Sequence, residues 1–166
     1  MQDTAAPLIN FACVEKLDSA PDSYPIGLFD DLEKAKGFLA DFRWVLSIEE
    51  EYLGGFYPEI IGIFLFKFTP KLVGVDDFVW VIVGEVPSAY ITVEECPNPA
   101  TALDGYIGAM EEWVEAVLNS EPTGGLIPVN ESETKENALV LIRRLKYLND
   151  LILPDCKGSL EEDRRQ

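Results

Sequence analysis

Five consecutive apolar residues, Val79 to Val83, constrain the fold of this chain more than any other segment. They are β-branched or aromatic, they lie between Phe78 and Gly84, and they do not alternate with polar residues. A strand with one face in solvent alternates between apolar and polar side chains, whereas an unbroken apolar strand has both faces covered. We therefore expect a central strand over residues 78–86, in a sheet that is covered on both faces.

Strand character extends to the segments on either side of this run. Residues 60–68 are rich in Ile and Phe, residues 89–93 are short and β-branched, and turn-forming Pro, Gly or Asp residues bound each segment. Three successive strands of this kind indicate an antiparallel meander. A further strand is expected over residues 8–14, and the glycine pairs Gly54–Gly55 and Gly124–Gly125 are expected to form turns.

One helix is expected near the N-terminus. Asp30 and Glu33 have the spacing of a capping box, and the apolar residues after them recur at helical intervals. Two interpretations remain open for the next segment. Ser47 and Glu50 repeat the box pattern and favour a short helical turn, whereas residues 44–46 are equally suited to a strand.

The last part of the chain changes to a helical period. Asn98 followed by Pro99 is typical of a helix start, and Thr134 caps a second long helix that we expect to end at Pro154. Strands in one block and helices in another predict an α+β fold. We expect a single domain over residues 1–157, with an antiparallel or mixed sheet of about four strands, one N-terminal helix and two long C-terminal helices packed on it. A polar, frayed tail is expected over residues 158–166.

Charge is distributed unevenly along the chain. The net charge is −17, and residues 72–134 contain no Lys or Arg. Such a chain is not expected to bind nucleic acid or an anionic membrane surface, because both need Lys and Arg to neutralise phosphates. Two interpretations of the acidic segment stay open: a surface that keeps the protein in solution, or a docking face for a basic protein partner.

Acidic residues that could form such a docking face occur before and after predicted strands and on one side of the predicted helix that starts near Asn98. Trp113 is added because a large aromatic side chain beside carboxylates is typical of an interface, although a Trp at a helix flank is also a common core residue. The candidate partner-binding residues are Asp76, Asp77, Glu94, Glu95, Asp104, Glu111, Glu112, Trp113 and Glu115.

Catalytic chemistry has little support in the residue types present. The chain has no His, and its three cysteines, at Cys13, Cys96 and Cys156, have no metal-binding or redox spacing. We expect no catalytic residue, no metal site and no cofactor. One alternative is a small enzyme that uses paired carboxylates and Mg²⁺, for example at Asp76–Asp77 or Glu94–Glu95. Another is a homo-oligomer without a ligand, in which exposed Trp44, Phe56 and Tyr57 cover one another across a two-fold axis.

We expect neither a signal peptide nor a membrane-spanning helix. The first residues lack the basic and long apolar regions of a signal peptide. The most apolar run, Ile60 to Phe66, is far shorter than the roughly 20 residues of a spanning helix. We therefore expect a cytoplasmic protein with reduced thiols.

A motif in the middle of the chain carries a family resemblance. Trp80 leads an apolar strand that continues into Gly-Glu-Val-Pro-Ser-Ala-Tyr at residues 84–90. Helical residues complete the pattern: Tyr106, Met110, Trp113, Val117, Leu145, Leu148 and Ile152, with Leu-Ile-Pro-Val at 126–129 and Pro154 at the end. In these features residues 56–154 resemble a family of small uncharacterised bacterial proteins, and the resemblance transfers no functional residue. Because Pro87 cannot donate to a strand ladder, we expect residues 84–89 to bend the chain between two strands, with Tyr90 anchoring the corner.

In size, acidity and lack of catalytic groups, the chain is also similar to immunity proteins that neutralise secreted bacterial toxins, many of which are basic nucleases. This similarity rests on charge and size, and no motif supports it. The sequence therefore predicts a non-catalytic, acidic protein-binding protein of the bacterial cytosol, for which an immunity protein that neutralises a basic toxin is one form.

Overall fold

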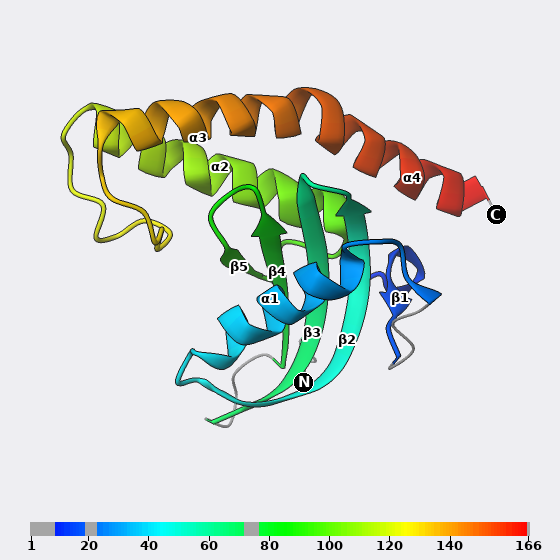
Figure 1. Cartoon of the computed structure of the whole chain (residues 1–166). Helices are drawn as coiled ribbons and strands as arrows, with labels where there is room; N and C mark the ends of the chain where they lie inside the picture. The colour runs from blue at the N-terminus through cyan, green and yellow to red at the C-terminus, as the bar shows by residue number, and fades with distance from the viewer. Residues whose placement is uncertain (1–8, 19–22, 72–76, 166) are drawn as a thin grey trace, which may run out of the picture.

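The computed structural model describes residues 9–18, 23–71 and 77–165 (Figure 1). Its centre is one antiparallel sheet of five strands in the order β1-β2-β3-β4-β5. The strands are β1 (Glu15–Lys16), β2 (Val45–Tyr57), β3 (Ile61–Pro70), β4 (Phe78–Gly84) and β5 (Ala89–Thr92). The α+β fold and the antiparallel meander are confirmed, and the sheet has one strand more than we expected.

Strand β4 is covered on both faces, as its unbroken apolar sequence predicted. Trp80 and Ile82 lie in the core cluster that contains the C-terminal helices, and Val81 lies in the cluster on the opposite face. Strand β3 is covered in the same way, because Phe64 and Phe66 point to one cluster and Ile63 to the other. Because successive side chains of a strand point to opposite faces, β3 and β4 each contribute to two separate cores.

The helices form a layer on each side of the sheet (Figure 1). Helix α1 (Leu28–Ala40) covers one face through Leu32, Ala35 and Leu39. Helix α2 (Pro99–Leu118) covers the other face, and α3 (Lys135–Tyr147) packs on α2. Asn98 and Thr134 cap these two helices with their side chains, as their positions predicted.

The N-terminal segment departs from the predicted strand. Leu8 lies outside the described residues, and residues 11–13 form a short 3₁₀-helix, η1 (Phe11–Cys13), so the strand predicted over residues 8–14 is wrong. The Asn10 side chain accepts a hydrogen bond from the Ala12 N–H and starts this turn. Strand pairing begins only at Glu15, which lies opposite Leu53 of β2.

Helix α1 begins earlier than the capping-box pattern predicted. Gly27 is its N-cap, with a φ of 92°, and no side chain caps the first turn. Asp30 lies inside the first turn of the helix and is not the cap, so the predicted capping box is wrong. A negative charge in the first turn still stabilises the helix by interacting with the N-terminal end of its dipole.

The pair Gly54–Gly55 lies inside β2, and the predicted turn at this position is wrong. The strand alternative for residues 44–46 is confirmed from Val45 onward, and the helical turn over residues 47–50 is not formed. A Cβ atom on Gly54 would lie 3.1 Å from Pro99 and Trp80, so glycine is needed here for close packing of α2 on the sheet. Gly124–Gly125 does lie in a turn, as expected.

The last helical segment does not end at Pro154. Helix α3 continues through a π-helical turn, η3 (Leu148–Ile152), into α4 (Leu153–Arg165). In a regular helix the ring of Pro154 would collide with the carbonyl group of Asp150. The wider π turn directly before Pro154 relieves this collision, so the helix continues. Residues 158–165 of the expected frayed tail belong to α4.

None of the helices in the described part of the chain combines the length and the apolar character that a membrane crossing requires.

Candidate protein-binding surface

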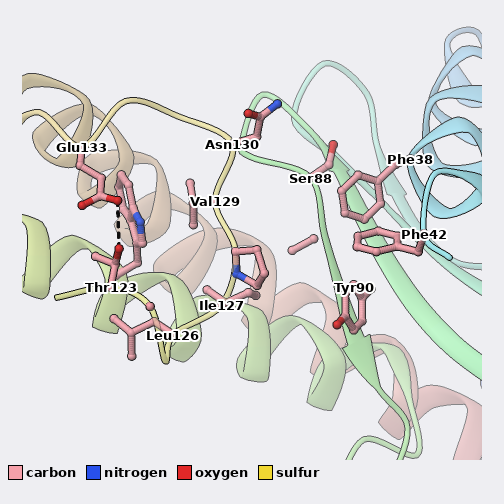
Figure 2. A pocket seen from close by; sticks show the side chains of 14 residues that line it. Phe38, Phe42, Ser88, Tyr90, Thr123, Leu126, Ile127, Val129, Asn130 and Glu133 are labelled. Carbon is pink, nitrogen blue, oxygen red and sulfur yellow. Dashed lines mark hydrogen bonds between the residues drawn. The ribbon is translucent and has the colours of Figure 1, made fainter. Parts of the chain in front are cut away.

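A cavity of about 520 Å³ lies at the edge of the sheet, next to β5 (Figure 2). Four parts of the chain form its wall: the C-terminal end of α1 with the turn after it, the start of β5, Trp113 of α2, and the segment that joins α2 to α3. Phe38, Phe42 and Tyr90 contribute from the face that α1 covers, whereas Trp113 contributes from the face that α2 covers. The cavity therefore spans both faces of the sheet at its β5 edge.

Aromatic rings pack against one another on the α1 side of the cavity. The ring of Phe42 meets the rings of Phe38 and Tyr90 edge to face, each with centroids 5.1 Å apart. Trp44 extends the cluster with a centroid 5.1 Å from that of Tyr90. Pairs in this geometry contribute about 0.5–1.5 kcal/mol each beyond the area they bury. Tyr90 thus anchors the beginning of β5, as its position after Pro87 led us to expect.

Two hydrogen bonds hold the corner between β4 and β5. Gly84 has a φ of 141°, and the Glu85 N–H donates to the Ile60 carbonyl at 2.9 Å. The Arg144 guanidinium donates to the carbonyl oxygen of Glu85 at 2.6 Å, which ties α3 to the corner. The expected bend over residues 84–89 is present, and these bonds set the position from which Ser88 and Ala89 enter the cavity wall.

The segment between α2 and α3 forms the outer wall (Figure 2). The Thr123 hydroxyl donates to the Glu133 carboxylate at 2.9 Å and closes the two ends of the segment against each other. Between them, Ile127 and Val129 are half-buried although they lie in a loop. Within the described residues, no hydrogen bond involves the backbone of residues 127–131. Side-chain contacts therefore hold this wall in place.

The predicted acidic residues are exposed wherever the structure describes them; Asp76 lies outside the described residues. Register places Asp77 and Glu94 at the same end of the sheet, since Val79 pairs with Thr92. Burial raises the pKa of the Cys96 thiol, and the charges of Glu95 and Asp104 add to this shift. Glu95 and Asp104 therefore lie in one neighbourhood.

Helix α2 carries the remaining acidic residues on its solvent side. Glu111, Glu112 and Glu115 are exposed, and no Lys or Arg occurs in this helix. None of the seven described candidate carboxylates takes part in a salt bridge between described residues. Three basic residues of the neighbouring helix α3 have other partners: Lys146 pairs with Asp150 at 2.8 Å, Arg144 binds the corner carbonyl, and Arg143 donates to the Leu139 carbonyl. The acidic charges of α2 are therefore not neutralised internally.

Trp113 does not belong to this exposed surface. Its side chain is 2% exposed and lies in the core between α2 and its neighbours. Of the two interpretations of Trp113, this burial favours the core residue, and its place among the partner-binding residues stays a prediction. Helical spacing explains the result, because Trp113 lies three residues after buried Met110 and next to buried Val114. Its edge reaches the cavity wall.

The aromatic residues predicted to cover one another in a homo-oligomer do not form one patch. Trp44 precedes β2, whereas Phe56 and Tyr57 lie at its far end. A strand rises about 3.3 Å per residue, so roughly 40 Å separates the two positions. Trp44 packs on Phe68 and Tyr90, and the Tyr57 hydroxyl donates to Asp155 at 2.9 Å.

Groups that could support catalysis do not converge on the cavity. Glu133 is the one carboxylate among the described residues that line it. No set of three Asp, Glu, Cys or His side chains suited to a metal ion is found in the described parts of the chain. Burial raises the pKa of the Cys156 thiol to about 11, so this group remains a protonated, weak nucleophile at neutral pH.

Comparisons of the chain with family models, with curated proteins and with solved structures found no match. The cavity was not predicted from the sequence. One signal could have indicated it: Leu126, Ile127 and Val129 are apolar residues in a loop rich in Pro and Gly, where polar residues are usual. Apolar side chains in such a loop need a surface to pack on or a ligand to contact.

Proposed function

We propose that this protein is a non-catalytic binding protein of the bacterial cytosol that captures a positively charged protein through the acidic surface formed by α2 and the β5 end of the sheet. An immunity protein that neutralises a basic toxin is the form of this function that fits its size and charge. The observation that carries the proposal is the set of exposed carboxylates on α2, which have no cationic partner among the described residues.

Energetics support a binding role for these carboxylates. Glu111 and Glu115 are four residues apart on one helix, and like charges at this spacing destabilise a helix by a few tenths of a kcal/mol. Glu115 also lies in the last turn of α2, where the helix dipole disfavours a negative charge. A surface that only maintained solubility could place these charges elsewhere at no such cost.

The proposed mechanism is electrostatic. A negative surface raises the rate at which a basic partner is encountered and repels acidic competitors. Because the carboxylates are exposed, salt screens their attraction for the partner over about 8 Å at physiological ionic strength. The association rate should therefore fall steeply as salt rises, while the dissociation rate should change little.

The test starts from a partner isolated on the immobilised protein and measures its association rate by surface plasmon resonance. Replacing Glu111, Glu112 and Glu115 by Gln should lower the association rate at low salt by about tenfold or more. The matched control removes the same charge from exposed sites elsewhere: Glu15→Gln, Glu33→Gln and Glu59→Gln together. Equal association rates for the two triple variants, or a rate that does not respond to salt, would contradict the proposal.

A further inference from the structure

Strand β5 has an edge that pairs with no other strand among the described residues. It is the last strand in the sheet order, and its pairing with β4 uses only one of its two edges. None of the backbone hydrogen bonds made by the described turns and loops reaches residues 89–92. Unpaired N–H and C=O groups on an edge strand are a template for another extended chain.

The cavity borders the beginning of β5, where one end of a strand added to its open edge would lie. Its wall continues past the sheet edge on both faces, with Phe42 and Tyr90 on the α1 side and Trp113 on the α2 side. Residues 127–130 form the opposite wall, and their backbone groups make no hydrogen bonds in the described structure. An extended chain placed here would find backbone partners at β5 and apolar side chains above and below.

Charge in the cavity wall selects the kind of chain that fits. Among the described lining residues, Glu133 carries the one full charge, and none is Lys or Arg. Trp113 directly follows Glu112 in α2, so the cavity and the unpaired carboxylates of α2 share the same turns of the helix. A basic chain would be attracted to this site, and an acidic chain would be repelled.

We infer that an extended segment of the basic partner binds along the open edge of β5, and that an apolar side chain of this segment inserts into the cavity between Phe42 and Trp113. This inference rests on the proposed function, since the partner's positive charge is what brings the segment to the surface. Main-chain hydrogen bonds to β5 would supply affinity, and alternate side chains would supply specificity.

The experiment uses labelled synthetic peptides as probes and measures fluorescence anisotropy with the full chain. The first peptide alternates Lys and Val around a central Phe. The second has the same charge but carries Pro at the Val positions, which removes the N–H groups a strand ladder needs. The third replaces each Lys by Glu. The first peptide should bind at least tenfold more tightly than either of the others, and it should slow hydrogen exchange of the amides of residues 89–92.

Protein variants separate the cavity from the acidic surface. Val129→Trp adds a large side chain to the half-buried outer wall and should weaken the first peptide at least tenfold. Leu151→Trp adds the same ring at a position that is 57% exposed on η3, and it should leave binding unchanged. Circular dichroism of both variants checks that each is folded.

Several results would overturn the inference. It is wrong if the Pro peptide binds as tightly as the first, if Val129→Trp binds normally, or if no peptide binds. It is also wrong if sedimentation detects a dimer of the chain and the amides of β5 are protected from hydrogen exchange without any peptide. The proposed function survives these results when the triple Gln variant of α2 still slows partner association. The reverse result is also informative. If Val129→Trp loses peptide binding while the triple Gln variant captures the partner at the normal rate, the proposed function is wrong and the strand site remains.

Discussion

The hydroxyl of Tyr106, in the middle of α2, donates a hydrogen bond of 2.6 Å to the carbonyl oxygen of Pro87 at the corner between β4 and β5. Tyr106 is fully buried, and burial raises the pKa of its phenol. This bond links the helix that carries the unpaired carboxylates to the corner from which β5 and the cavity wall begin. The acidic surface and the open strand edge are thus held in a fixed relation to each other.

Removing this hydroxyl should weaken both the fold and the corner. Tyr106→Phe leaves the Pro87 carbonyl without its donor, which should lower the free energy of unfolding by about 1–3 kcal/mol. Urea denaturation measures this loss, and amide hydrogen exchange should accelerate first around residues 84–90. Tyr147→Phe is the control, because Tyr147 is 45% exposed and makes no hydrogen bond through its hydroxyl in the described structure. Equal stability of the two variants would show that the Tyr106 bond does not hold the corner.

Gly84 should be among the positions least tolerant of a side chain. Its φ is 141°, and a Cβ atom there would lie 2.2 Å from the carbonyl oxygen of Ile60. Gly84→Ala should therefore lower the free energy of unfolding by about 3 kcal/mol or more. Gly108→Ala is the matched comparison. Gly108 lies in α2 with nothing within 4 Å of an added Cβ, so its replacement should stabilise the protein by about 0.5–1 kcal/mol. Thermal and urea denaturation of both variants should give changes of opposite sign.

The layered part of the fold was predictable because it depends on periodicity. The unbroken run from Val79 to Val83 required cover on both faces, and the structure supplies α1 on one face and α2 on the other. Helix starts at Asn98 and Thr134 were predictable because the side chain that caps a helix acts over three residues. Local patterns of this kind are read directly from a single sequence.

Features that depend on contacts between distant segments were not predictable. Gly54–Gly55 has the composition of a turn, but contacts with Pro99 and Trp80 determine its role in β2. Pro154 is tolerated inside a helix because a π turn precedes it, and no sequence pattern predicts that turn. The cavity is the extreme case, since α1, β5 and the α2–α3 segment meet there only in the folded chain.

Tyr52 and Glu50 give a prediction for alkaline pH. The Tyr52 hydroxyl donates to the Glu50 carboxylate at 2.6 Å, and this bond raises the pKa of Tyr52 to about 12. The folded state holds the phenol proton more tightly than the unfolded state, in which the pKa is about 10. The resulting stability is present below pH 10 and is lost as pH rises from 10 to about 12.

Absorbance at 295 nm follows tyrosine ionisation and tests this assignment. Tyr52→Phe should remove an ionisation step near pH 12, and Glu50→Gln should move that step to lower pH because the carboxylate is gone. Tyr90→Phe provides a tyrosine control that keeps the Glu50 bond intact. An unchanged step near pH 12 in Tyr52→Phe would show that another tyrosine is responsible.

Glu115 provides the sharpest test of the binding proposal, because stability and binding should respond to its replacement in opposite directions. In Glu115→Lys, the new ammonium group lies four residues after Glu111, where an ion pair stabilises a helix by about 0.2–0.5 kcal/mol. It also lies in the last turn of α2, where a cation interacts favourably with the helix dipole by about 0.3–1 kcal/mol. The variant should therefore unfold at higher urea concentration than the natural chain while a basic partner associates with it more slowly at low salt.

Glu15→Lys makes the same charge change on β1, at the opposite edge of the sheet, and should leave the association rate close to that of the natural chain. If Glu115 lowers the stability of the helix and raises the rate of partner capture, its role in capture is the best explanation for a carboxylate at this position. If Glu115→Lys is more stable and binds the partner equally fast, the acidic face of α2 has no part in recognition, and the binding surface must be sought at the open edge of β5 alone.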